Sequence, residues 1–289
     1  MKIAIGTVQF GMHYGVANQS ERMVPIAEVE QILLEANQRG VDTLDTAMSY
    51  GESQQALGTV GVGCWRVVGK LQAVPDGVGD ISGWARDQTK SSMAKLKITQ
   101  LHGLLLHRPA QLHGWRGNEL YDALQGLKEE GLVRKVGISI YDPTELDQVL
   151  DKYKFDLVQA PLNILDRRML DSGWLARLHA AGVEVHARSI FLQGLLLMAR
   201  ASRPHKFDRW RDIWDEWERW LEAVGLTPLE ACLRYALSEQ MLDRLVIGVD
   251  SFQQFKEIVA VAGESLNSLP NFPSSVDPIL INPSMWNTI

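Results

Sequence analysis

Asp45, Tyr50, Lys70 and His107 have side chains that could together deliver a proton to a carbonyl oxygen. A tyrosine hydroxyl has a pKa of about 10, so it is a weak acid at neutral pH, but an adjacent ammonium group lowers that pKa by favouring the phenolate. A buried carboxylate would keep the lysine charged, because a charge removed from water needs a partner. An imidazole could hydrogen-bond the same substrate oxygen. These residue types therefore indicate acid catalysis at a carbonyl group.

Three of these four residues end short apolar runs that are typical of β-strands. Asp45, Lys70 and His107 are the last residues of such runs, and Tyr50 follows Asp45 by five positions. In all, eight runs have this character, at 2–7, 41–45, 66–70, 103–107, 133–139, 156–159, 183–188 and 244–247. If the strands are parallel neighbours, their carboxyl ends meet at one rim, and the four side chains can converge there.

Amphipathic stretches of helical periodicity separate the strands, at 26–38, 84–96, 119–129, 143–151, 172–180 and 252–262. Gly40, Gly131 and Gly182 follow three of these stretches, as expected where a helix ends at a left-handed residue. Alternating strands and helices imply parallel pairing through right-handed crossovers. Eight such units in about 250 residues predict an α/β fold, a (β/α)₈ TIM barrel. We expect residues 1–289 to form a single domain of this kind.

Two segments lie outside this repeat. The segment 204–224 contains four tryptophans spaced four, three and three residues apart, at Trp210, Trp214, Trp217 and Trp220. On a helix they share one broad face, so we expect an extra Trp-rich helix that packs against the barrel, with a wall of the substrate pocket as the alternative. The tail after Leu269 contains Pro270, Pro273, Pro278 and Pro283, which predict an irregular C-terminal tail.

The composition excludes several classes of protein. With 46% apolar and 22% charged residues, the chain is typical of a folded protein rather than a disordered one. A net charge of −6 without a long basic run argues against nucleic acid or an anionic membrane as the partner. The sequence has no apolar run of about 18 residues, no signal-peptide pattern and no CxxC pair, which together indicate a cytoplasmic protein. No group of Cys and His residues has the spacing of a zinc site, so no metal is expected.

The four candidate residues occur in motifs that resemble those of the aldo-keto reductase superfamily. DTAMSYGES contains Asp45 and Tyr50, GKL contains Lys70, and LLLHRP contains His107. Further motifs match the family in the same order, namely GLVRKVGIS at 131–139, QAPLN at 159–163, FLQGLL at 191–196 and IGVDSFQQFKEI at 247–258. The similarity covers nearly the whole chain, and four separated positions in the right order make it specific.

The resemblance implies a barrel that binds a nicotinamide cofactor without a Rossmann domain and uses it to reduce aldehydes or ketones, or to oxidise alcohols in reverse. NADP(H) is the expected cofactor, and NAD(H) is not excluded. By this similarity Tyr50 is the general acid, Lys70 and Asp45 tune it, and His107 orients the carbonyl. The implied cofactor-binding residues are Gly6, Thr7, Asp45, Ser139, Gln159, Arg188, Ser189, Phe191, Leu192, Gln193, Gly194, Gly248, Asp250, Gln254 and Glu257.

The chain departs from the family pattern at two of these positions. Many members have an aromatic residue stacked on the nicotinamide where this chain has Arg188, whose planar guanidinium could stack, meet an anionic group or form a structural ion pair. Asp250 lies where members often carry basic side chains or a small hydroxyl. A carboxylate repels a 2′-phosphate but accepts a hydrogen bond from a ribose 2′-hydroxyl. We therefore expect weaker discrimination in favour of NADP(H) than is usual.

Phe10 and Trp115, on the loops after the first and fourth predicted strands, are expected walls of a pocket for a small-molecule carbonyl substrate. Nothing in the sequence assigns an oligomeric state.

Two alternative functions remain. A cofactor-loaded regulatory or interaction subunit of the same fold would have little turnover and would dock partners through the Trp-rich helix and the tail. A phosphate-binding barrel lyase or isomerase would have no affinity for nicotinamide.

Overall fold

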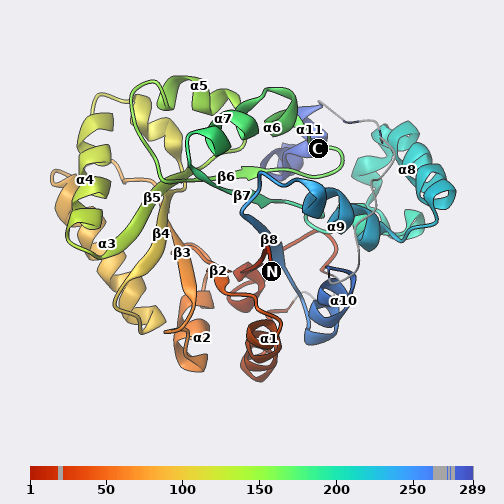
Figure 1. Cartoon of the computed structure of the whole chain (residues 1–289), viewed down its shortest axis with the longest axis horizontal. Helices are drawn as coiled ribbons and strands as arrows, with labels where there is room; N and C mark the ends of the chain where they lie inside the picture. The colour runs from red at the N-terminus through yellow and green to blue at the C-terminus, as the bar shows by residue number, and fades with distance from the viewer. Residues whose placement is uncertain (19–21, 263–271, 273, 275–276, 289) are drawn as a thin grey trace.

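Eight parallel strands follow one another around a closed barrel in sequence order, and β8 returns to pair with β1 (Figure 1). The computed structural model describes residues 1–18, 22–262, 272, 274 and 277–288. The strands are β1 Ile3–Gly6, β2 Thr43–Asp45, β3 Arg66–Leu71, β4 Leu101–Leu106, β5 Val133–Ser139, β6 Leu157–Pro161, β7 Glu184–Arg188 and β8 Arg244–Gly248. The predicted (β/α)₈ barrel is therefore confirmed.

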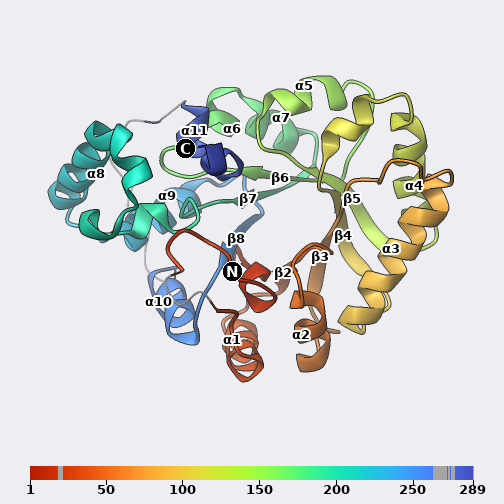
Figure 2. The ribbon, with the colours of Figure 1, turned by 180° about the vertical axis from the view of Figure 1, so that it is seen from behind.

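Helices surround the strands, as both views show (Figures 1 and 2). They are α1 Ile26–Gln38, α2 Ser53–Val60, α3 Ile81–Leu96, α4 Gly117–Glu129, α5 Thr144–Val149, α6 Arg168–Asp171, α7 Trp174–Ala180, α8 Arg211–Val224, α9 Pro228–Ser238, α10 Phe252–Ala262 and α11 Pro278–Ile281. Short 3₁₀ helices lie at η1 Val8–Phe10, η2 Pro109–His113, η3 Leu195–Leu197, η4 Arg200–Ser202, η5 His205–Trp210 and η6 Pro283–Thr288. Gly40, Gly131 and Gly182 have φ of 75°, 73° and 70°, which confirms the predicted left-handed helix ends. Within the described residues, no helix combines the length and apolarity that a membrane span requires.

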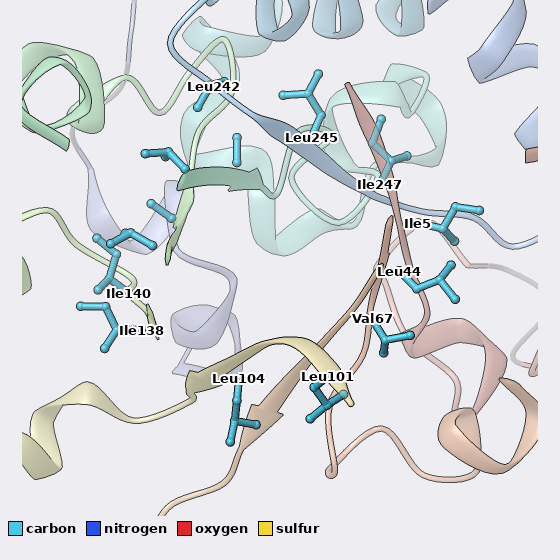
Figure 3. Close-up of a cluster of buried hydrophobic side chains, with 14 of the residues drawn as sticks. Ile5, Leu44, Val67, Leu101, Leu104, Ile138, Ile140, Leu242, Leu245 and Ile247 are labelled. Atoms are coloured by element: carbon cyan, nitrogen blue, oxygen red, sulfur yellow. The ribbon is translucent and has the colours of Figure 1, made fainter. Parts of the chain in front are cut away.

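Side chains alternate between the two faces of each strand, and this alternation decides which face each polar side chain occupies. Apolar side chains such as Ile5, Leu44 and Ile247 belong to the large core between the strands and the helices (Figure 3). Val68, Leu105 and Leu157 form a separate small cluster. Asp45 pairs with Val68, and Lys70 lies two residues beyond it on the same face of β3. The residues that end the strands therefore project toward the same rim of the barrel.

The tryptophans of the Trp-rich segment are packed rather than exposed, as we expected. They pack against neighbouring segments, however, and not against the strands. Trp210 directly precedes α8, and α8 lies outside α9 in Figure 1. Trp217 is 1% exposed, donates its indole N–H to the Leu196 carbonyl at 3.2 Å and stacks on Trp220 at 5.6 Å between ring centroids. These tryptophans share a second hydrophobic cluster with Phe207 and with C-terminal residues Phe272, Leu280 and Trp286. None of the four lines the cavity described below, so they form no wall of it.

The described part of the tail contains α11 and η6 and is therefore more regular than the sequence predicted. The side chain of Asp277 accepts a hydrogen bond from the Ile279 N–H at 2.9 Å, and Pro278 occupies the first turn. Both features are typical of a helix start. Pro270 and Pro273 lie outside the described residues, and the expectation for them is not addressed.

Candidate active site

A cavity of about 400 Å³ opens at the carboxyl ends of β1, β2, β6, β7 and β8. Fourteen of the residues expected at the site line it, namely Gly6, Thr7, Asp45, Tyr50, Gln159, Arg188, Ser189, Phe191, Gln193, Gly194, Gly248, Asp250, Gln254 and Glu257. They come from distant parts of the chain, and the barrel brings them together.

Lys70 connects Asp45 to Tyr50 at one end of this cavity. The ammonium group of Lys70 donates to Asp45 Oδ1 and lies 3.4 Å from the Tyr50 hydroxyl oxygen. Gln159 Nε2 donates to the other oxygen of Asp45, Oδ2, at 2.7 Å. Lys70 and Asp45 are each 2% exposed. The buried carboxylate thus holds the ammonium group in place, and the ammonium group points to the phenol.

Close backbone packing positions Tyr50 on the turn after β2. A side chain at Gly11 would overlap the Tyr50 carbonyl oxygen and the Ser53 N–H, so only glycine fits there. The Glu52 N–H also donates to the Gly11 carbonyl at 3.2 Å. The hydroxyl of Ser53 donates to Thr7 Oγ1 at 2.9 Å, which ties the start of α2 to the end of β1. The Tyr50 turn is therefore fixed against the segment that follows β1.

Burial raises the pKa of Tyr50 above its usual value, and the nearby Lys70 ammonium offsets only part of that effect. The sequence-based expectation of a lowered pKa is therefore wrong for the free protein, because the effect of burial on the phenol exceeds that of the ammonium group. Burial also disfavours the charged form of Lys70, but Asp45 and Tyr50 together outweigh it, and the pKa of Lys70 is raised. At neutral pH the phenol keeps its proton and the lysine keeps its charge, a combination suited to a proton donor.

His107 directly follows β4, and its backbone N–H donates to the Leu71 carbonyl at 2.9 Å. Burial lowers the pKa of this imidazole to about 4, assisted by the positive charges of Lys70, Arg108 and Arg188. The ring is therefore neutral at physiological pH and can donate one hydrogen bond. Neither Lys70 nor His107 is among the lining residues of the cavity. Lys70 contacts two of them, Asp45 and Tyr50, and His107 lies near enough to Lys70 and Arg188 for their charges to act on its ring.

The low pKa of His107 predicts the pH dependence of turnover. A histidine with an ordinary pKa of about 6.5 would change charge near neutrality. Because His107 stays neutral down to about pH 4, we expect the pH profile of kcat/KM for carbonyl reduction to show no inflection from this residue near pH 6.5. The profile of His107→Gln should therefore have the same shape as that of the unmodified protein. A rate profile over pH 5 to pH 9 for both proteins checks this, and an inflection present only in the unmodified chain would contradict it.

Four expected site residues lie elsewhere. Phe10 is 3% exposed in the main core, because η1 turns its ring inward, so it is no pocket wall. Trp115 is 92% exposed, between η2 and α4, and the Arg116 guanidinium carbon lies 5.4 Å from the centre of its ring. Leu192 is fully buried in the second hydrophobic cluster, and its side chain does not line the cavity. Ser139 is also buried outside the lining, although it pairs with Gln159 across β5 and β6.

The segment Tyr14–Asn18, which we call the β1 strap, lines the cavity and was not expected. The side-chain amide of Gln193 donates to the Tyr14 hydroxyl at 2.9 Å, and Asn18 Nδ2 donates to Asp250 Oδ1 at 3.0 Å. Gly194 approaches so closely that a side chain there would overlap the Ala17 methyl group. The β1 strap thus connects the loops after β7 and β8. The one sequence signal for it is the long stretch between the first strand and the first helix, since long loops in compact domains are often functional.

Further lining residues were missed, and those with polar side chains lie in two places. Thr227, Pro228 and Leu229 begin α9 with a capping box, in which Thr227 and Glu230 exchange hydrogen bonds. The sequence TPLE is a recognisable signal of such a helix start. Gln9 also lines the cavity. The side-chain oxygens of Gln9 and Gln159 are buried without a hydrogen-bond partner among the described residues, so each can accept a bond from a bound molecule.

Comparison with known proteins gives consistent matches. The chain is 29% identical to an aldo-keto reductase of Mycolicibacterium vanbaalenii over 127 residues, which cover 43% of this chain and 44% of that protein, less than half of either. It is 24% identical to the NADH-specific methylglyoxal reductase of Escherichia coli over 277 residues, covering 81% of this chain and 82% of that protein. The solved structure of an aldo-keto reductase of Bacillus halodurans in its holo form superposes with a TM-score of 0.71 at 20% identity, covering 92% of this chain and 88% of that one. At that identity the likeness concerns the fold.

The family model described as "Aldo/keto reductase family" matches residues 2–268, which is most of the 289-residue chain. The barrel, the order of its motifs and this match agree, and the chain belongs to the aldo/keto reductase family.

Proposed function

We propose that this protein reduces a small-molecule aldehyde or ketone with a nicotinamide cofactor bound in the cavity, and that Tyr50 is the general acid. The observation that carries the proposal is the buried connection from Asp45 through Lys70 to the Tyr50 hydroxyl at the cavity end. Family membership supports carbonyl reduction in general. The roles of the individual residues rest on the geometry of this site.

The residues of the cavity fit a nicotinamide dinucleotide. Gln159 has a buried acceptor oxygen without a partner, which suits the amide N–H of a nicotinamide carboxamide. The loop after β7, from Ser189 to Gly194, contacts the β1 strap, and both line the cavity, so these residues would hold the pyrophosphate. Asp250, Gln254 and Glu257 would face the adenosine half.

In the proposed reaction the bound cofactor supplies the hydride that reaches the carbonyl carbon. Tyr50 Oη gives its proton to the carbonyl oxygen, so that an alcohol forms and a phenolate remains next to Lys70. The ammonium group at 3.4 Å stabilises that phenolate, and Asp45 keeps the ammonium group charged and oriented. The neutral imidazole of His107 hydrogen-bonds the same oxygen as negative charge develops on it.

Titration of the protein with NADH and with NADPH, followed by a panel of aldehydes and ketones, tests the proposal. We expect saturable binding of at least one cofactor and carbonyl-dependent oxidation of it. Cofactor binding without turnover on any carbonyl would favour a regulatory subunit, although the tryptophans that would form its docking face are largely buried. Absence of cofactor binding would contradict the proposal and favour a barrel lyase or isomerase.

We further propose that NAD(H) binds at least as well as NADP(H). Among the described lining residues the one cationic side chain is Arg188, which lies at the Tyr50 end, whereas Asp250 and Glu257 are acidic. A 2′-phosphate beside the Asp250 carboxylate would bring two negative charges together, which is unfavourable. The relative from Escherichia coli that matches 81% of this chain is an NADH-specific enzyme, which supports this preference.

Replacing Asp250 with serine is expected to favour NADPH. The ratio of the Kd for NADPH to the Kd for NADH should fall by about tenfold. The reason is that serine removes the negative charge and leaves a hydroxyl that can donate to a 2′-phosphate. Fluorescence titration with both cofactors measures the ratio. Asp76→Ser, a substitution of the same type in an exposed loop outside the cavity, is the control and should leave the ratio unchanged. An unchanged ratio in Asp250→Ser would count against this assignment.

A further inference from the structure

Arg188 lies at the end of β7 and lines the cavity beside Tyr50, and the partners of its guanidinium group among the described residues are uncharged. Its Nη2 donates to the Ile140 carbonyl at 2.9 Å, and Nη1 donates to the Ser189 hydroxyl at 3.1 Å. The central carbon lies 4.5 Å from the centre of the Tyr141 ring. None of these groups is charged, and no carboxylate of the described residues forms an ion pair with Arg188.

Other half-buried arginines in the described part of the chain show what this side chain lacks. Arg168 pairs with Asp166 at 2.8 Å, and Arg244 pairs with Asp42 at 3.1 Å. Arg167 also lacks a carboxylate, but it stacks on Tyr235 outside the cavity. A partly desolvated charge is normally matched by an opposite charge. Arg188 is thus a half-buried guanidinium that faces an open cavity without its counter-ion, and a ligand could provide that counter-ion.

The distribution of charge places this counter-ion at the carbonyl end of the cavity. Lys70 and Asp45 neutralise each other, and the buried His107 ring is uncharged. The positive charge of Arg188 therefore stays uncompensated next to Tyr50. At the other end of the cavity, Asp250 and Glu257 would repel an anion. In the part of the cavity that would hold the substrate, an anionic group is therefore favoured beside Arg188.

We propose that Arg188 binds a carboxylate carried by the substrate, so that the preferred substrates are oxo acids whose carboxylate lies a few bonds from the carbonyl. This inference rests on the proposed reductase function. A guanidinium presents parallel N–H donors that match the two oxygens of a carboxylate. The contacts with Tyr141, Ile140 and Ser189 hold the guanidinium in a fixed orientation, so that the acid end of the substrate would orient its carbonyl toward Tyr50 and His107.

Two aldehydes of the same length, succinic semialdehyde and its amide, test the proposal because they differ in charge but hardly in shape. A hydrogen bond to a charged group contributes about 1.5–3 kcal/mol, which corresponds to roughly a 10- to 150-fold change. We expect the unmodified protein to prefer the acid by about this factor in kcat/KM, mainly through KM. In Arg188→Gln the ratio of kcat/KM for the acid to kcat/KM for the amide should fall to about one.

Arg188→Lys keeps the charge without the paired donors and should retain an intermediate preference for the acid; it also carries the test if Arg188→Gln does not fold. Arg167→Gln, which removes a half-buried arginine outside the cavity, is the matched control and should keep the full preference. An equal loss for acid and amide together with a raised Kd of NADH would overturn the proposal and assign Arg188 to the nicotinamide. A preference for glyceraldehyde phosphate over glyceraldehyde without any preference for the acid would overturn the carboxylate assignment.

The failure of this inference is distinguishable from that of the proposed function. If acid and amide are reduced equally well by the unmodified protein, Arg188 selects no anion, while the reductase function stands. If neither aldehyde nor any member of the wider carbonyl panel is reduced, although NADH binds, both proposals are wrong.

Discussion

Tyr50→Phe is expected to reduce kcat for carbonyl reduction by about 10²- to 10⁴-fold, the range of a lost general acid, while the Kd of the cofactor stays nearly unchanged. The substitution removes only the hydroxyl oxygen that lies 3.4 Å from the Lys70 ammonium group. The backbone of the turn at residue 50 still packs against Gly11, and Lys70 still pairs with Asp45. The loss should therefore appear in the chemical step. Single-turnover oxidation of the reduced cofactor measures it directly.

Tyr121→Phe is the matched control for this prediction. Tyr121 lies on α4, and its hydroxyl donates to the Lys154 carbonyl at 2.9 Å, outside the cavity. Its removal should leave kcat within about twofold. Similar turnover in Tyr50→Phe and the unmodified protein would end the assignment of Tyr50 as proton donor. A large rise in the Kd of the cofactor in Tyr50→Phe would instead indicate that the hydroxyl serves binding.

The barrel and the core of the site could be predicted because both follow from regular patterns. Apolar runs alternate with amphipathic ones along the chain, and parallel strands in a barrel end at one rim. Asp45, Lys70 and Gln159 are each at or near the end of such a run, so their convergence followed from topology before any contact was known.

The positions of Phe10 and Trp115 and the pKa of Tyr50 could not be predicted. They depend on loop conformation and on burial, and the hydrophobic periodicity of the sequence indicates neither. Phe10 follows a strand as a pocket residue would, but the 3₁₀ turn η1 directs it into the core. Trp115, between η2 and α4, is almost fully exposed to solvent. The pKa of Tyr50 shows the same limit. The spacing of residues indicates which charges come near, whereas the burial that dominates this pKa depends on the packed structure.

Lys70→Met is expected to lower the free energy of unfolding by about 3–5 kcal/mol at neutral pH and to abolish most turnover. Lys70 is almost completely buried, and its ammonium group forms the one ion pair of Asp45 among the described residues. Without it, Asp45 keeps only the hydrogen bond from Gln159, and a buried negative charge remains without a counter-ion. Urea denaturation followed by circular dichroism measures the loss of stability. Arg66→Met, at the exposed start of β3, is a control that should change stability by less than about 1 kcal/mol.

Combining Lys70→Met with Asp45→Asn separates the two roles of this ion pair. The double variant has no buried charge at either position, and an asparagine oxygen can still accept the hydrogen bond from Gln159. Because replacing both members of a buried pair is often nearly neutral, we expect most of the lost stability to return. Turnover should stay low, since no ammonium group stabilises the Tyr50 phenolate. A double variant as unstable as Lys70→Met would show that the lysine stem, rather than the uncompensated charge, causes the loss. Recovered turnover would mean that Tyr50 transfers its proton without Lys70, and the acid mechanism proposed for this site would be wrong.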